Sequence, residues 1–338
     1  MKTLRIMVAA LMAAFAFSCA KSTIDVPADS KGMAVKVRAE LGSMTKTTYT
    51  EAAGAMKVEW TANDSLSVLT YRMTPDGEEL VSCDILVNTN GAGKAGVFEG
   101  TLTEVEGDVR RIAFYPAVLL QPVYPGEEEF KMICHPGGLM PSVVVGDGEF
   151  TLMDQMFTSA QDPLRYAKDY DIMSGVLDMD GGDASVDLVH QGSLLKLDLA
   201  LPEDSYESVS GSYGMLALII DVAVDALHEF DYEGMPSEDI AFDEDGNVVF
   251  VENFYDNYMA SRRFVFIEEG EVNGGTLEAY VTFNQEFVIP QGTQITVTLA
   301  DVDINEETET VLASKAVTAP SDLAFRKGEF NKMKMTLE

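Results

Sequence analysis

The chain has 338 residues, of which 56 are aspartate or glutamate and 23 are lysine or arginine, so its formal net charge is −33. The length is enough for two domains of ordinary size. A surface this acidic repels phosphate groups, which makes nucleic acid and anionic lipid head groups poor partners. The acids alternate with apolar residues along the chain instead of forming a separate tail, which indicates a folded, strand-rich protein.

The N-terminus predicts export. Two basic residues, Lys2 and Arg5, precede an apolar run, Ile6–Phe17, that is too short to span a bilayer. Ser18, a small residue, follows this run, and Cys19 comes next. This arrangement resembles the processing site of bacterial lipoproteins, so we expect residues 1–18 to be a signal peptide and Cys19 to be acylated, with palmitate among its lipids. The alternative is an ordinary secretory signal in which Cys19 is incidental.

A small, polar segment at residues 19–32 is expected to be a tether between the lipid and the fold. The next stretch, Ala34–Leu41, alternates strictly between apolar and charged residues. Such alternation predicts a half-buried first strand. Its apolar face is Val35, Val37, Ala39 and Leu41, and its polar face is Lys36, Arg38 and Glu40.

The N-terminal half continues with short strands separated by turn residues. Residues 153–170 lack the alternation and leave room for a short helix. The glycines of Asp180–Asp183 make a flexible break, where we place a domain boundary. One strand is predicted to end at Val58–Trp60. The other strands predicted in this half are Ser65–Tyr71, Leu80–Val87, Ala95–Leu102, Val109–Tyr115, Glu129–Cys134, Glu149–Met153 and Asp171–Asp178.

The C-terminal half has the same character, and Asp245-Gly246 predicts a tight hairpin. Many short strands with frequent turns predict an all-β chain of two β-sandwiches in tandem, at residues 33–183 and 184–338. The longest apolar run after the N-terminal one, Met215–Ile220, is cut by Asp221 and is expected to be a buried strand. The strands predicted in this half are Val186–His190, Ser193–Leu201, Gly214–Val224, Asn247–Val251, Arg262–Glu268, Thr276–Asn284, Thr293–Asp301, Thr310–Val317 and Glu329–Leu337.

Two cysteines remain after Cys19. Cys83 lies on the apolar side of its strand, and Cys134 shares a face with Phe130 and Met132. They are expected to be two buried thiols. A disulfide between them in an oxidising compartment is the alternative.

The chain contains, in this order, a series of spaced fragments: Thr45–Thr47, Trp60–Val68, Phe98–Gly100, Ala113–Pro116, Asp169–Met173, Val186–His190 and Phe325–Phe330. This series resembles the fimbrillin family, the subunits of the donor-strand-assembled fimbriae of Bacteroidales and their related surface lipoproteins. The resemblance implies two transthyretin-like β-sandwiches, no catalysis and no cofactor. It also implies a place in the cell outer membrane or fimbrium, with other fimbrial subunits as partners and a host or bacterial surface molecule as a further candidate ligand.

The resemblance also implies a mechanism of maturation. In family members that polymerise, a protease removes the first strand, and a strand from another subunit fills the groove. Here the strand removed would be Ala34–Leu41. The family's cleavage position usually holds arginine, whereas this chain has Lys46, which suits a trypsin-like protease. The alternative is that Lys46 is a solvated loop residue.

The C-terminal segment is a candidate donor strand. Met333, Met335 and Leu337 form one face of a strict alternation, opposite lysines and a threonine. Its alternative role is an ordinary final strand that packs in its own domain, with lysines protecting the edge.

Other chemistry has little support in the sequence. The three histidines, His135, His190 and His228, have no metal-ligand spacing. The acidic segments at Asp178–Asp183 and Asp243–Asn247 do not complete a calcium loop, so acidic turns are expected. No catalytic motif appears, and we do not expect an enzyme.

A monomeric glycan-binding surface lipoprotein is the alternative function, with Phe254–Tyr258 as a candidate platform. The presence of a single tryptophan, Trp60, counts against it.

Overall fold

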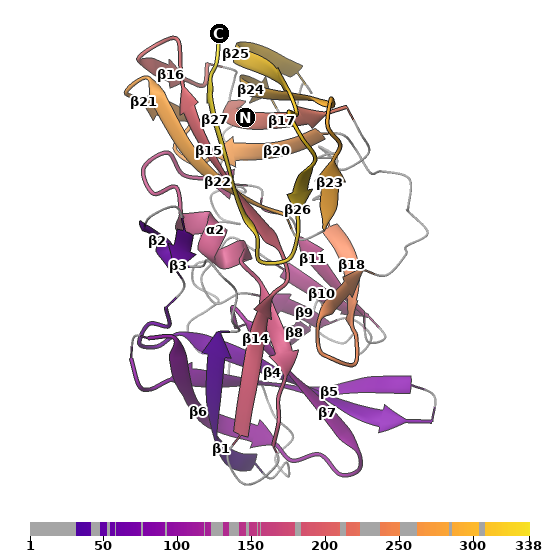
Figure 1. Ribbon diagram of the computed structural model, residues 1–338. Helices are drawn as coiled ribbons and strands as arrows, with labels where there is room; N and C mark the ends of the chain where they lie inside the picture. Colours follow the sequence, from indigo (N-terminus) through magenta and orange to yellow (C-terminus); the bar gives the residue numbers. More distant parts are fainter. Residues whose placement is uncertain are drawn as a thin grey trace, which may run out of the picture.

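The protein is described by a computed structural model in which nearly every element is a β-strand (Figure 1). The described residues are 32–41, 48–52, 55–57, 59–75, 77–91, 93–117, 119–122, 131–134, 142–146, 149–153, 155, 157–179, 184–209, 214–223, 237–250, 262–283, 286–303 and 308–338. Within them, helix is confined to one turn-and-a-half element, α2 (Arg165–Tyr170), in the segment where the sequence allows a short helix. The predicted all-β fold is confirmed. None of the described residues form a helix long and apolar enough to cross a membrane.

The N-terminal strands form one sheet that closes on itself as a barrel, in the order β1-β14-β13-β7-β4-β5-β6. Alternating apolar residues on these strands point inward and build a single core around Trp60, which is fully buried. The barrel occupies the lower part of Figure 1. Its strands are β1 (Gly32–Leu41), β4 (Ser65–Thr74), β5 (Gly77–Asn88), β6 (Ala95–Thr103), β7 (Val109–Tyr115), β13 (Met173–Val176) and β14 (Ala184–His190).

The C-terminal strands form two facing sheets, at the top of Figure 1. The first has the order β12 (Phe157–Thr158), β20 (Arg262–Ile267), β17 (Gly214–Val222), β24 (Gln294–Asp303) and β25 (Thr308–Thr318). The second has the order β22 (Thr276–Phe283), β15 (Ser193–Ala200) and β27 (Phe330–Thr336). One large apolar cluster, which includes Leu197, Leu218 and Leu299, fills the space between them.

A six-stranded sheet draws on both halves of the chain. Its order is β19 (Val248–Phe250), β18 (Ser237–Phe242), β11 (Glu149–Met153), β10 (Ser142–Gly146), β9 (Lys131–Cys134) and β8 (Leu119–Pro122). Three short strand pairs complete the fold: β2 (Thr48–Ala52) with β3 (Ala55–Lys57), β16 (Ser205–Glu207) with β21 (Glu271–Asn273), and β23 (Phe287–Ile289) with β26 (Leu323–Phe325).

Strand pairing crosses the expected boundary between residues 183 and 184. The strand after it, β14, belongs to the N-terminal barrel, where it pairs with β1 and β13. The strand before the break also reaches β14, because Asp178 and Ser185 form a bridge. Residues 180–183 themselves lie outside the described residues, but the strands on both sides of them pair within one barrel. Glycines predict a break in a strand pattern, but they carry no information about which strands lie on either side of it.

Candidate functional site

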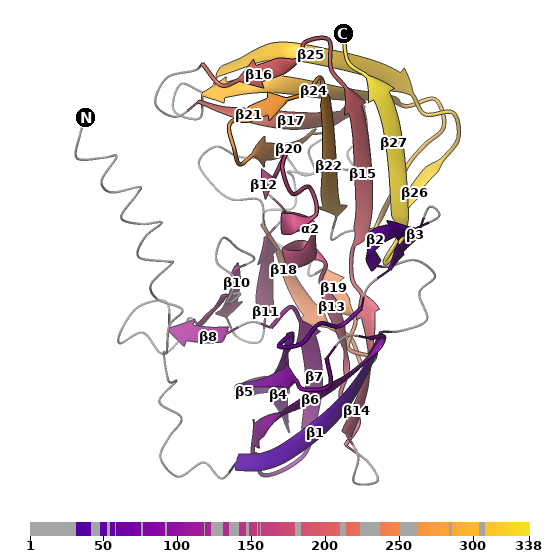
Figure 2. The ribbon, with the colours of Figure 1, turned by 90° about the vertical axis from the view of Figure 1, so that its left-hand side faces the viewer.

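The first strand, β1, lies between two neighbours in the barrel (Figure 2). It pairs antiparallel with β6, from Gly32 opposite Thr103 to Glu40 opposite Ala95. It also pairs parallel with β14, from Val37 beside Ala184 to Leu41 beside Leu188. Both of its hydrogen-bonding edges are therefore occupied over the second half of the strand, and its removal would leave a groove with two strand edges.

The inward face of β1 closes the barrel core. Val37 and Ala39 are fully buried, as the alternation predicts. Val35 is partly buried against the same cluster, and so is Met33, which the sequence analysis leaves outside the strand. The side chain of Leu41 is outside the described residues. Burial of a valine is worth about 1.5–3 kcal/mol, so this face contributes substantially to the barrel.

Trp60 forms the wall of the groove at the end that holds Ala39. Gly96 of β6 lies directly opposite Ala39, and a Cβ placed on Gly96 would lie 3.0 Å from Trp60 Cδ1. The indole makes edge-on contacts with Phe98 and Tyr115, with ring centroids 4.9 Å and 5.2 Å apart. The fully buried indole is thus packed on more than one side, in the same core cluster as Ala39.

The outward face of β1 is charged and solvated. Lys36 Nζ lies 2.9 Å from Glu99 Oε1 on β6, and Arg38 lies 2.6 Å from Glu40. The lysine and arginine side chains are each about two-thirds exposed, at 68% and 67%. Exposed ion pairs of this kind contribute only about 0–1 kcal/mol. Glu99 nevertheless places a negative charge beside the strand's outer face.

The candidate donor residues lie in their own domain. Strand β27 pairs parallel with β15, from Phe330 beside Leu194 to Thr336 beside Ala200. Met335 and Leu337 are buried in the core between the C-terminal sheets, and Met333 packs partly against it. At the end of the chain, Glu338 and Ser314 of β25 exchange backbone hydrogen bonds of 3.0 Å and 3.1 Å. Donation of this strand would require it to leave these contacts.

The segment that joins β14 to β15 connects the barrel to the C-terminal sheets. The amide of Gly328, in the turn before β27, donates to the carbonyl of Gly192 at 2.6 Å. The amide of Leu194 donates to Glu329 at 2.9 Å. On the barrel side, the amide of Gln191 donates to Ile172 at 2.8 Å. This joint therefore contacts both the barrel and the turn that starts β27.

A buried pair of one histidine and one aspartate lies at the same joint. His190 is 3% exposed, and its Nδ1 lies 2.7 Å from Asp171 Oδ1. Burial lowers the pKa of His190, but the charge and hydrogen bond of Asp171 outweigh burial and raise that pKa above its usual range. Asp171, His190 and Ser193 line one small cavity of about 20 Å³.

The serine, histidine and aspartate at this cavity are not joined as a catalytic triad in the part of the chain that the structure describes. The Ser193 hydroxyl has no hydrogen-bond partner among the described residues, so no bond joins it to His190. A cavity of about 20 Å³ has room for a single water and for no larger substrate. The His190–Asp171 pair lies at the joint between the barrel and the C-terminal sheets, where its hydrogen bond links the end of β14 to the residue before Ile172.

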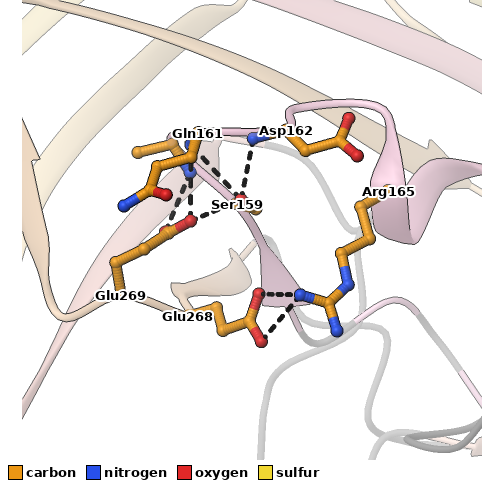
Figure 3. A network of polar contacts seen from close by, with 7 residues as sticks. Ser159, Gln161, Asp162, Arg165, Glu268 and Glu269 are labelled. Atoms are coloured by element: carbon orange, nitrogen blue, oxygen red, sulfur yellow. Dashed lines mark hydrogen bonds and ion pairs between the residues drawn. The ribbon is translucent and has the colours of Figure 1, made fainter.

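A second polar network fastens the segment before α2 to the turn after β20 (Figure 3). Glu269 accepts hydrogen bonds from the Ser159 hydroxyl and, at 2.9 Å, from the amide of Ala160. Burial raises the pKa of Glu269, but these hydrogen bonds outweigh it and lower that pKa overall. Arg165 Nη1 lies 3.0 Å and 2.8 Å from the two carboxylate oxygens of Glu268. The network positions α2 and leaves its oxygens engaged within the fold.

The acidic turn at Asp243–Asn247 is a hairpin turn between β18 and β19, as predicted. Asp243 Oδ1 accepts from the amides of Asp245 at 3.0 Å and Asn247 at 2.8 Å. The turn docks on the barrel, where the Ser174 hydroxyl donates to the carbonyl of Gly246 at 2.7 Å. The Asp243 carboxylate is thus engaged in hydrogen bonds within the turn. The described residues contain no group of three or more acidic, histidine or cysteine side chains that could hold a metal.

Several predicted positions fall outside the described residues: Cys19, Lys46, His135, His228, Phe254–Tyr258 and the side chain of Cys134. Lipidation at Cys19, cleavage at Lys46 and the state of the Cys83–Cys134 pair therefore stay predictions. Cys83 itself is buried, as its alternation predicts. The sequence analysis missed Trp60 and Gly96 as the groove wall, because their roles depend on which strands meet in the barrel.

Comparisons with known proteins give structural neighbours only. No protein-family model matches the chain, and no curated protein matches it significantly. A candidate cell-adhesion protein from Bacteroides ovatus is 13% identical, with 90% of this chain and 92% of that chain covered and a TM-score of 0.40. A fimbrial assembly protein from Parabacteroides distasonis is 10% identical, with coverages of 90% and 92% and a TM-score of 0.33.

A third neighbour is the fimbrial anchor protein Mfa2 from Porphyromonas gingivalis, which is 10% identical. The match covers 86% of this chain and 100% of that chain, with a TM-score of 0.30. At TM-scores below 0.5 and identities of 10–13%, neither family membership nor function follows from these similarities. The neighbours are fimbrial and cell-adhesion proteins, the classes that the fimbrillin resemblance of the sequence names.

Proposed function

We propose that this chain is a cell-surface lipoprotein that serves as a structural subunit or as an accessory anchor or tip component of fimbriae. It assembles by β-strand donation after proteolytic removal of β1, and it is not an enzyme. The observation that carries the proposal is the position of β1, a strand near the N-terminus that lies between two barrel strands and closes the core with Val37 and Ala39.

A barrel that loses β1 becomes a receptor for an extended peptide. The edges of β6 and β14 would present unpaired backbone groups, and the core around Trp60 would be exposed to water. An incoming strand would pair the backbone groups and cover the core at the same time. Its backbone hydrogen bonds provide affinity, and its alternate side chains fill the core positions. The vacated groove is therefore specific for a strand of the right pattern.

The order of residues in the chain links anchoring to maturation. Cys19 precedes β1 and Lys46 follows it, so one cut after Lys46 would release the lipid and the strand together. A cut chain is ready for strand exchange and no longer anchored by its lipid. An uncut chain stays anchored with its groove filled, as suits a component at the base of a fimbrium.

Mapping of the N-terminus of the protein isolated from cells tests this proposal. In assembled, heat-labile oligomers we expect a start at Thr47, and a Lys46→Ala variant should lose both the new N-terminus and the oligomers. Lys46→Arg is the matched control, because a trypsin-like protease accepts either base. If wild-type protein shows neither trimming nor an oligomer ladder, assembly by strand exchange is wrong.

A further inference from the structure

The Ala39 position is the most restricted part of the groove. Ala39 is fully buried, and it lies between Gly96 on one side and Val186 on the other. Two rings cover Gly96, because a methyl group added there would lie 2.4 Å from Phe98 Cε2 and 3.0 Å from Trp60 Cδ1. The Ala39 methyl group is thus enclosed in the barrel core beside the rings that cover Gly96. A larger side chain at this position would have to displace packed neighbours.

The Trp60 wall is held in place. Its backbone amide donates to Gly93 at 2.8 Å, and its carbonyl accepts from the Gly93 amide at 3.1 Å. Its ring packs edge-on against Phe98 and Tyr115 and has no exposed surface. The indole cannot swing aside to enlarge the Ala39 position without disrupting these contacts.

The rest of the groove is wider and carries a charge. Met33 and Val35 are only partly buried, so their positions tolerate larger apolar side chains. On the outer face, Glu99 lies directly opposite Lys36. A strand that replaces β1 therefore needs large apolar residues first and a base opposite Glu99. It then needs a residue no larger than alanine at the Ala39 position.

The C-terminal strand of a second copy does not meet this requirement. No residue from Phe330 to Glu338 is as small as alanine. The register that places Lys334 opposite Glu99 puts Leu337 at the Ala39 position, where it adds three carbon atoms to a filled space. Any other register that covers that position, in either direction, also places a larger side chain there.

We infer that the β1 groove is a size filter that excludes this chain's own C-terminal strand. Its partner is a different protein, which supplies an extended segment with an apolar–x–apolar–base–aliphatic–x–alanine or glycine pattern. The inference rests on the proposed strand exchange and makes the chain a component of mixed assemblies. If β27 leaves its own core, it then enters the groove of a different subunit with its side chains Met333, Met335 and Leu337.

Peptide exchange into the full chain tests the filter. A specific-protease site is placed between Leu41 and Thr48, and the chain is folded with β1 in place, nicked and challenged with excess labelled peptide. The peptides are Gly32–Leu41, its Ala39→Gly and Ala39→Leu forms, and Glu329–Glu338, all of equal length. Mass spectrometry of the recovered complex measures how much of each peptide replaces β1.

We expect the wild-type and Ala39→Gly peptides to exchange, and the Ala39→Leu and Glu329–Glu338 peptides to be retained at least about tenfold less. A Trp60→Ala protein should recover binding of the Ala39→Leu peptide. Equal retention of all four peptides would overturn the filter while leaving strand exchange intact. If not even the wild-type peptide exchanges, the proposed strand exchange itself fails. The comparison of the four peptides uses one and the same protein, so the outcome that decides the filter does not depend on the folding of the Trp60→Ala variant.

Discussion

The two strands nearest the chain ends are held in different ways. Both run parallel to parts of one continuous segment, β1 beside β14 and β27 beside β15. However, β1 has neighbours on both edges, whereas in the part of the chain that the structure describes β27 pairs along one edge, with β15. Beyond β27, Glu338 exchanges backbone hydrogen bonds with Ser314 of β25. A strand with two partners leaves only when the barrel opens or the chain is cut, while a strand with one partner can fray.

This difference assigns the two strands different roles in the proposed assembly. Enclosure of β1 makes proteolysis the step that opens the groove, because thermal release would expose Val37, Ala39 and the Trp60 core together. The single edge of β27 makes it the strand that can separate without a cut. Its burial of Met335 and Leu337 still opposes release, at about 1.5–3 kcal/mol for each large side chain.

A charge introduced into each strand should produce the largest difference between them, measured as the loss in the free energy of unfolding. Val37→Asp places an unpaired carboxylate in the barrel core, and we expect it to lower the free energy of unfolding by about 4 kcal/mol or more. Met335→Asp, at a position that is 8% exposed on a strand with one partner, should cost about half as much because the charge can reach water when the edge frays. Urea unfolding measures both. Equal losses would mean that both strands are enclosed to the same degree.

Amide hydrogen exchange should show a smaller, local contrast. The amides of β1 over Val37–Glu40 have strand partners on either side and should exchange slowly, close to the rate of global opening. In β27, the amides that point away from β15 should exchange markedly faster than their alternate neighbours. Mass spectrometry or NMR resolves the pattern. Uniform protection along β27 would contradict the single-edge description.

The smallest expected effect is a pH dependence of stability that arises from His190 and Asp171, at the joint between β14 and β15. Because Asp171 raises the pKa of His190 in the fold above the unfolded value of 6.5, the pair's stabilisation is fully present below that value. It is lost as pH rises through the higher folded pKa. Stability should therefore fall across this window in the wild type, and His190→Gln should remove that part of the dependence. Unfolding curves at several pH values measure it, and an unchanged profile in the variant would rule out the pair as the source.

Local patterns predicted much of this structure. The alternation in Ala34–Leu41 correctly placed Val37 and Ala39 inward and Lys36 and Arg38 outward, because the side-chain period of a strand is a local property. The strand at Val109–Tyr115 was also predicted at its observed limits. Pairing between distant strands was not accessible, because the sequence of β14 does not state that it lies beside β1.

The groove illustrates the limit of sequence analysis. Trp60 was visible as the single tryptophan and Gly96 as an ordinary glycine, but their joint restriction on Ala39 arises only when β6 and β1 pair. The burial of Trp60 also removes it as a surface contact for a glycan. The strand at Ser142–Gly146 was missed because its short apolar run has no alternation, and such runs are ambiguous.

A reversible lock on β1 tests the central claim most directly. Lys36 and Glu99 lie opposite each other on exposed faces of β1 and β6, so a Lys36→Cys, Glu99→Cys pair can join the strands by a disulfide. If β1 must leave its groove for assembly, the oxidised variant forms no heat-labile oligomers on cells, reduction restores them, and each single cysteine variant assembles normally. Oligomers formed at the wild-type level by the oxidised double variant would contradict the account.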